Sequence, residues 1–143
     1  MSYVRIYVHL VFCTKNRYPF LEDGLRNEIF QHMKENAKEK GLWLDSINGF
    51  TDHVHCLIGL RREQSISYVA QMIKGESSIW INRMKLTKLK FQWQDDYWAK
   101  GVSEEQLQRV RQYIFNQEKH HKSISLDEEI TMLFPEASNV FED

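Results

Sequence analysis

The N-terminal segment alternates between apolar and other side chains. In residues 3–13 every even position is apolar, and the odd positions carry a mixed aromatic and polar set that includes His9. This period-two pattern predicts a β-strand with one buried face. Apolar residues at every fourth position from Leu25 to Ala37 then predict a helix that begins at about residue 22 and stops at Gly41.

Two further strands are predicted over residues 42–50 and 53–60. Only two residues separate them, so we expect an antiparallel hairpin. Ser65 is a suitable N-cap for a helix whose apolar stripe extends to Trp80. The aromatic-rich segment 91–99 predicts a fourth strand.

A last helix is predicted over about residues 104–121. Ser103 and Gln106 have the spacing of a capping box, and Gly101 interrupts the pattern before them. The order β-α-β-β-α-β-α predicts an α+β fold. It indicates a ferredoxin-like split βαββαβ antiparallel sheet with two helices on one face and an additional C-terminal helix on the other.

Composition indicates one soluble globular domain. The chain has 143 residues, of which 42% are hydrophobic and 27% charged. No apolar run approaches the length of a membrane span, and the N-terminus lacks the pattern of a signal peptide. Cys13 and Cys56 are too few for a disulfide framework. We therefore expect no membrane association and a cytoplasmic location.

The charge is unevenly distributed. The net charge is −1, but residues 61–90 hold seven basic and two acidic residues, or +5, and residues from 118 onward hold seven acidic and two basic residues, or −5. A basic middle is compatible with a local phosphate-binding surface, although solvated helix faces produce the same pattern. We predict a domain over 1–121 and an acidic tail over 122–143. In that tail, Leu126 to Phe134 is suited to a short helix that packs on the body or gates the site.

The third strand opens with Asp52-His53-Val54-His55. Side chains two apart in a strand point to the same side, so His53 and His55 project together. Two adjacent imidazoles form half of a metal site. The alternatives are a structural pair exposed on the sheet, or a zinc site completed by Cys13 or by His120 and His121.

The last helix presents Tyr113 and Gln117 four residues apart on one face. Leu107, Val110 and Ile114 form a different, apolar stripe that would anchor the helix. Tyr113 is thus displaced from the centre of that stripe, although a buried aromatic residue is the common explanation of a tyrosine on a helix.

This combination resembles the single-tyrosine transposases of small bacterial insertion sequences. These enzymes belong to the His-hydrophobic-His (HUH) superfamily of single-strand endonucleases, and they are related to proteins associated with repetitive extragenic palindromes (REP). The resemblance extends over about residues 3–121. It rests on the segments Tyr7 to Arg17, Ile47 to His55, Ile73 to Ser78 and Val110 to Gln117.

The resemblance implies Tyr113 as the nucleophile and His53, His55 and Gln117 as ligands of a divalent metal ion. The implied ion is Mg²⁺, with Mn²⁺ able to substitute. The implied reaction cleaves and rejoins single-stranded DNA near hairpins through a 5′-phosphotyrosine. The resemblance also implies a homodimer, in a bacterial or archaeal cell, in which the tyrosine helix serves its own or the partner's histidines.

Single strands bind through positive charge and aromatic platforms. The candidate phosphate contacts are Lys15, Arg17, Arg61, Arg62 and Lys74. The aromatic residues at 93, 97 and 98 are better suited to packing in the fourth strand than to stacking on bases.

Two other functions stay open. One is a domesticated, non-mobile relative that acts as a nucleic-acid-binding or regulatory module and needs neither metal nor tyrosine. The other is a zinc-stabilised or zinc-hydrolase domain.

Overall fold

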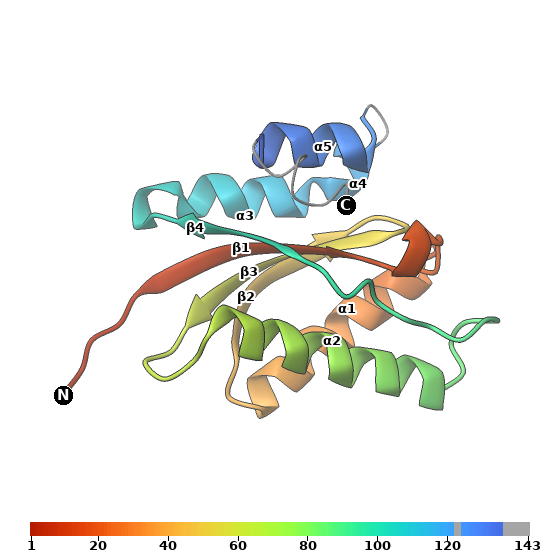
Figure 1. Ribbon diagram of the computed structural model, residues 1–143, viewed down its shortest axis with the longest axis horizontal. Helices are drawn as coiled ribbons and strands as arrows, with labels where there is room; N and C mark the ends of the chain where they lie inside the picture. The colour runs from red at the N-terminus through yellow and green to blue at the C-terminus, as the bar shows by residue number, and fades with distance from the viewer. Residues whose placement is uncertain (122–123, 136–143) are drawn as a thin grey trace.

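A computed structural model describes residues 1–121 and 124–135 of the chain. One antiparallel sheet lies between two layers of helices (Figure 1). Its strands are β1 (Ile6–Cys13), β2 (Trp43–Gly49), β3 (His53–Leu60) and β4 (Trp98–Val102), in the order β2-β3-β1-β4. Helices α1 (Leu25–Glu39) and α2 (Ile66–Arg83) cover one face, and α3 (Leu107–Phe115), α4 (Gln117–His120) and α5 (Leu126–Leu133) lie over the other. The predicted ferredoxin-like α+β fold is confirmed.

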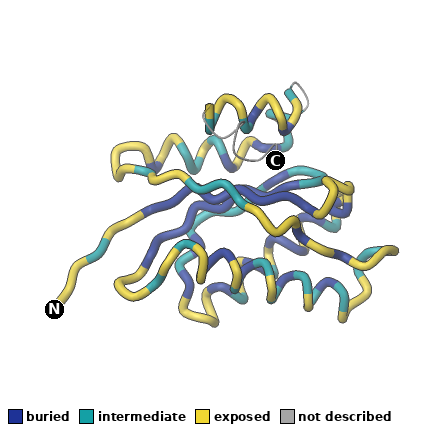
Figure 2. Tube along the Cα trace, in the orientation of Figure 1, coloured by how far each residue is buried: buried dark blue, intermediate teal, exposed yellow. Residues whose placement is uncertain are grey.

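The two central strands, β1 and β3, are buried along almost their whole length (Figure 2). Even-numbered side chains such as Leu10 and Phe12 pack in the core between the sheet and helices α1 and α2. Odd-numbered Tyr7 packs instead with Leu57 and with Ile114 of α3. The predicted alternation therefore separates an apolar core from the face on which the histidines lie.

The fourth strand lies later in the chain than the predicted 91–99. Phe91 and Trp93 are buried outside any strand, in edge-to-face contact with each other, and Trp93 also contacts Phe12. Gly101, which was expected to interrupt the pattern, lies within β4 and pairs with β1. The prediction was wrong because aromatic enrichment reports burial, which a packed loop provides as well as a strand does.

Helix starts follow local capping chemistry. Ser65 accepts a hydrogen bond from the backbone N–H of Tyr68, and the capping box of Ser103 and Gln106 is present. That box opens a short 3-10 helix, η2 (Glu104–Gln106), from which α3 continues. The first helix begins at Leu25, three residues later than predicted.

The predicted helix over 104–121 is divided at Asn116, between α3 and α4. Asn48 of β2 donates a hydrogen bond from Nδ2 to the carbonyl of Phe115 at 2.9 Å. The Asn48 side chain thus gives the Phe115 carbonyl the hydrogen bond that a backbone N–H would donate if the helix continued. Tyr113 and Gln117 therefore do not lie on one uninterrupted helix, and their relative position depends on this turn.

No helix within 1–121 or 124–135 combines the length and the apolar character that crossing a bilayer requires.

Gly49 allows the β2–β3 hairpin to close next to His53. A Cβ atom at Gly49 would lie 2.2 Å from the backbone oxygen of His53. Gly49→Ala is therefore expected to distort the hairpin and to lower the free energy of unfolding by about 1–3 kcal/mol, measured by urea denaturation. Gly101→Ala is the control, because a Cβ there meets nothing within 4 Å. Equal stability of the two variants would contradict this account.

Candidate active site

His53 and His55 lie side by side beneath the α3–α5 layer, and both are fully buried. The Nδ1 atom of His53 lies 2.9 Å from Oδ1 of Asp52, and the Nδ1 atom of His55 lies 2.8 Å from Nε2 of His9 on β1. These contacts hold both rings by their Nδ1 atoms. Both Nε2 atoms therefore point away from the sheet, toward the same space.

The protonation states of His9 and His55 suit metal binding, whereas the contacts of His53 favour its protonated form in the absence of an ion. Burial lowers the pKa of His9 to about 3 and that of His55 to about 4, so both rings are neutral at neutral pH. Burial also opposes charge on His53, but its hydrogen bonds to Asp52 and Glu129 outweigh burial and raise its pKa. Neutral imidazole is the form that binds metals.

The structure brings Tyr113 and Gln117 to the same place. Oε1 of Gln117 lies 3.2 Å from Nε2 of His53, and the ring of Tyr113 lies 5.8 Å from the ring of His55, centroid to centroid. Gln117 is fully buried and Tyr113 is half-buried. All four residues implied by the family resemblance thus converge within one chain.

Glu129 of α5 lies at the centre of this group. Its Oε1 atom lies 2.9 Å from Nε2 of His55, 2.9 Å from Nε2 of His121 and 3.4 Å from Nε2 of His53. Its Oε2 atom accepts hydrogen bonds from Gln117 at 2.9 Å and from the hydroxyl of Tyr113. The site therefore contains a buried carboxylate that touches each of the four predicted residues.

The carboxylate and the phenol have opposite protonation preferences. Burial opposes charge on Glu129, but its hydrogen bonds to three histidines outweigh burial and hold its pKa far below the usual range. Burial and the bond to Glu129 raise the pKa of Tyr113 well above its ordinary value. At rest Glu129 is ionised and Tyr113 keeps its proton.

The donor set fits a divalent cation. A neutral His53 that donates from Nδ1 to Asp52 has only a lone pair at Nε2, and this lone pair faces two oxygens, those of Gln117 and Glu129. Such a cluster of lone pairs needs either a further proton on His53 or a cation between the atoms. The contact with Asp52 also matches the carboxylate–histidine pairs that orient metal ligands in proteins.

Sequence reasoning did not identify Glu129, His9 or Asp52 as site residues, and it considered His121 only as part of a zinc alternative. One signal for Glu129 was available. Within α5 it shares the inward face with Leu126, so a carboxylate lies on the apolar side of an amphipathic helix. The described part of the tail thus forms the predicted short helix, whereas residues 122–123 and 136–143 lie outside the described residues.

The predicted phosphate contacts are not brought together at the histidine site. Arg17 lies at the edge of the site, 3.8 Å from Asp52 and 2.7 Å from Asp127 of α5. Arg61 and Arg62 follow the far end of β3, about 20–30 Å along the chain from the histidines at about 3.3 Å per residue. Of the five predicted phosphate contacts, only Arg17 lies beside the histidine site.

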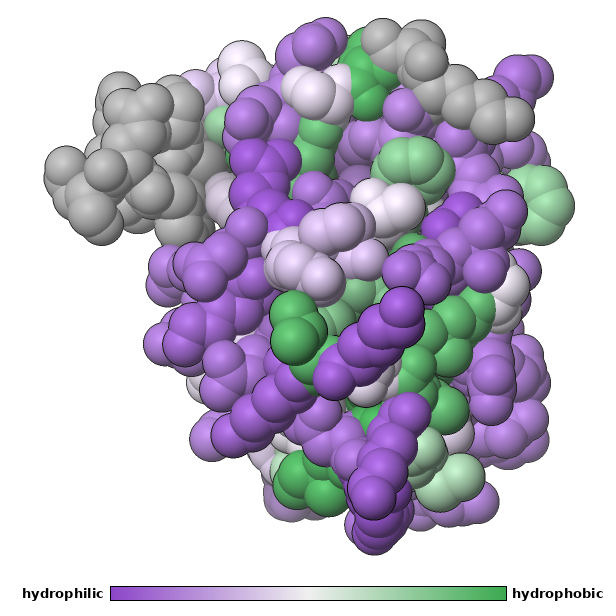
Figure 3. All heavy atoms as spheres, turned by 90° about the vertical axis from the view of Figure 1, so that its right-hand side faces the viewer, coloured by the Kyte–Doolittle hydropathy of each residue, from purple (hydrophilic) through white to green (hydrophobic). Residues whose placement is uncertain are grey.

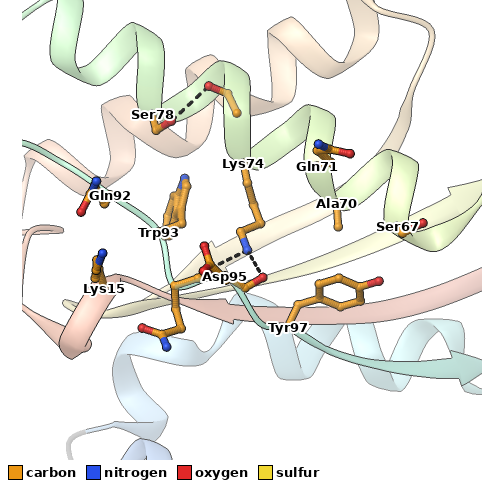
Figure 4. A pocket seen from close by; sticks show the side chains of 12 residues that line it. Lys15, Ser67, Ala70, Gln71, Lys74, Ser78, Gln92, Trp93, Asp95 and Tyr97 are labelled. Carbon is orange, nitrogen blue, oxygen red and sulfur yellow. Dashed lines mark hydrogen bonds between the residues drawn. The ribbon is translucent and has the colours of Figure 1, made fainter.

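Lys15 and Lys74 line an open pocket of about 510 Å³ between α2 and the segment before β4 (Figure 4). Lys74 points from α2 toward that segment and donates to the backbone carbonyls of Gln94 and Asp95. Two of its three ammonium hydrogens are therefore engaged in holding the loop.

Comparisons with known proteins identify the family of the chain. The family described as IS200-like transposase matches residues 2–117. ISDra2 transposase TnpA of Deinococcus radiodurans is 26% identical over 117 residues, which cover 76% of this chain and 81% of the relative.

Two solved structures share the fold. A Deinococcus radiodurans R1 protein assigned as a transposase is 27% identical, with a TM-score of 0.65 over 82% of this chain and 95% of that one. A REP-associated tyrosine transposase bound to a REP hairpin is 16% identical, with a TM-score of 0.62 over 87% of this chain and 73% of that one, and it supports the fold alone. Since the family match spans most of the chain, the protein belongs to the IS200-like transposase family.

Proposed function

We propose that this transposase, a DNA-cleaving enzyme by family, cuts and rejoins single-stranded DNA near hairpins through a covalent bond to Tyr113. The observation that carries the proposal is the convergence of Tyr113, His53, His55 and Gln117 around one buried carboxylate. Nucleophilic catalysis needs such an arrangement, because a phenol is a weak nucleophile at neutral pH until its proton is removed.

In the proposed step the phenol oxygen of Tyr113 attacks the scissile phosphorus. The bond from phosphorus to the 3′-oxygen breaks, and a 5′-phosphotyrosine and a free 3′-hydroxyl form. Oε2 of Glu129 orients the phenol by accepting its hydrogen bond, the phenol proton leaves to solvent as the new bond forms, and the departing 3′-oxygen takes up a proton from solvent. One phosphodiester replaces another, so attack by a 3′-hydroxyl on the phosphotyrosine rejoins strands without ATP.

The ligands of the divalent ion in this proposal are Nε2 of His53, Nε2 of His55 and Oε1 of Gln117. Gln117 is oriented for this role because its amide N–H donates to Glu129, which turns Oε1 toward His53. A bound Mg²⁺, or Mn²⁺ in its place, would withdraw charge from a non-bridging phosphate oxygen.

Single-stranded, hairpin-bearing DNA is the proposed substrate. A structural relative is solved with a REP hairpin, and Arg17 lies beside the site. The end of the molecule at which β1 leads into the 3-10 helix η1 (Lys15–Arg17) is mostly hydrophilic, with apolar side chains scattered between polar ones (Figure 3). A surface of this kind suits contact with a charged backbone.

The homodimer implied by the resemblance is also a proposal. Tyr113 lies beside His55 of its own chain, so attack by the tyrosine at the histidines of its own chain needs no second copy. Light scattering coupled to size exclusion measures the assembly state.

The direct test mixes the protein with a hairpin-bearing oligonucleotide and Mg²⁺ or Mn²⁺. We expect an adduct that resists denaturation, with a nucleotide mapped to Tyr113 by peptide mass spectrometry. Hairpin binding without cleavage in either ion would instead favour the non-mobile binding module. Tightly held zinc with thiolate coordination would favour the zinc domain, although the cluster of donor atoms found among the described residues contains His121 and not Cys13.

Asp52→Asn tests the orientation of His53. The variant weakens the acceptor of the Nδ1 hydrogen bond, so Mn²⁺ affinity is expected to fall by about 10- to 100-fold, measured by isothermal titration. Asp96→Asn, an exposed change on the loop before β4, should leave the affinity unchanged. Unaltered affinity in Asp52→Asn would show that this carboxylate does not support the ligand.

A further inference from the structure

We propose that Glu129 and His121 bind the same divalent ion as His53 and His55, so that the C-terminal helix α5 is part of the metal centre. This inference rests on the proposed function, because it assumes that the histidine pair binds a metal.

The ligand atoms are close enough for one ion. The Nε2 atoms of His53, His55 and His121 and a carboxylate oxygen of Glu129 all lie within 4.8 Å of one another. Ligands about 2.0–2.2 Å from one zinc-like ion lie about 3.4 Å apart in a tetrahedron. The four atoms therefore need only small movements to surround a cation.

Without a further proton on His53, hydrogen bonding alone does not satisfy this arrangement. Three imidazole nitrogens approach the single oxygen Oε1 of Glu129, which has only two lone pairs. His53 already directs its Nδ1 atom at Asp52. A cation at the centre would accept lone pairs from all three rings and from the carboxylate at once.

The packing of α5 supports the same conclusion. The helix has eight residues, and only Leu126 and Glu129 among them are buried. Isolated helices of this length are marginal in water, and one buried apolar side chain contributes about 1.5–3 kcal/mol. Burial of a carboxylate is costly unless it is paired or coordinates a metal. A bond from Glu129 to an ion would add to the hydrogen bonds that this carboxylate already makes and would strengthen the attachment of α5.

The donor set has a consequence for metal choice. Three imidazoles, one carboxylate and the amide oxygen of Gln117 favour a transition-metal ion such as Mn²⁺ over Mg²⁺, which prefers oxygen ligands. Oε2 of Glu129 stays free to accept the hydrogen bond from Tyr113 while Oε1 faces the ion.

Mn²⁺ titration followed by electron paramagnetic resonance tests the proposal on the full chain. Glu129→Gln and His121→Gln are each expected to weaken Mn²⁺ binding by at least about 10-fold, the smallest effect typical of a lost supporting group. Glu128→Gln is the matched control, since Glu128 is the exposed neighbour on the same helix, and it should bind Mn²⁺ as the unaltered protein does.

Amide hydrogen exchange provides a second readout that also reports folding. Mn²⁺ should slow exchange over residues 126–133 in the unaltered protein and not in Glu129→Gln, while slow exchange in β1 and β3 shows that the variant is folded.

If His53→Asn abolishes Mn²⁺ binding but Glu129→Gln and His121→Gln bind normally, this inference is overturned and the proposed histidine site stands. If the unaltered protein binds no Mn²⁺, both fail. An equal loss in Glu128→Gln would also overturn the inference, because the effect would then reflect only the charge of α5.

Discussion

Tyr113→Phe is expected to abolish the covalent protein–DNA adduct and to reduce strand cleavage by at least about 10⁴-fold, the scale of loss when a nucleophile is removed. The change deletes one oxygen atom from a half-buried ring. Glu129 keeps its contacts with Gln117 and with the histidines, so Mn²⁺ and DNA binding should persist. Gel electrophoresis of labelled oligonucleotides measures cleavage and adduct together.

Tyr68→Phe is the control for this prediction, because Tyr68 is exposed on α2, beneath the opposite face of the sheet. It should form the adduct at the normal rate. An adduct that persists in Tyr113→Phe would assign the nucleophile to another residue and would remove the central element of the proposed mechanism.

The double variant His53→Asn/His55→Asn is expected to lose Mn²⁺ binding and to slow cleavage by about 10³-fold or more. A bound metal stabilises a phosphoryl transition state by several kcal/mol, which corresponds to a factor of this size. Chelation of divalent ions should reduce the activity of the unaltered protein to the same level, and added Mn²⁺ should restore the unaltered protein only.

His32→Asn is the matched control for this pair. His32 stacks on Trp80 and contacts Glu76, away from the site, so its replacement should change neither Mn²⁺ binding nor cleavage. Full cleavage by the double variant in the presence of a chelator would show that the histidines have no metal-dependent role.

The sequence was most informative where one local rule decides the outcome. Alternation in β1 and β3 predicts which face each side chain takes, so the common orientation of His53 and His55 follows from spacing alone. Ser65 and Ser103 mark helix starts because a cap is a contact between near neighbours in sequence. The chain length and the order of strand-like and helix-like apolar patterns along the chain were enough to predict the ferredoxin-like sheet.

Sequence patterns were less reliable where burial has more than one cause. Phe91 and Trp93 are hydrophobic and buried, yet they pack from a loop, and β4 lies seven residues later than their position suggested. The turn at Asn116 depends on Asn48, a residue of another strand, so no local pattern predicts it.

By itself the sequence determined the fold class, the face of the histidine pair and, through family resemblance, Tyr113 and Gln117 as candidates. Only the tertiary structure decided that Glu129 and His121 join them. Glu129 lies 74 residues from His55 in the chain, and a contact over such a separation is set by how α5 packs on the sheet. Helical and strand periodicities describe one element at a time, whereas the composition of a buried polar site depends on which elements meet.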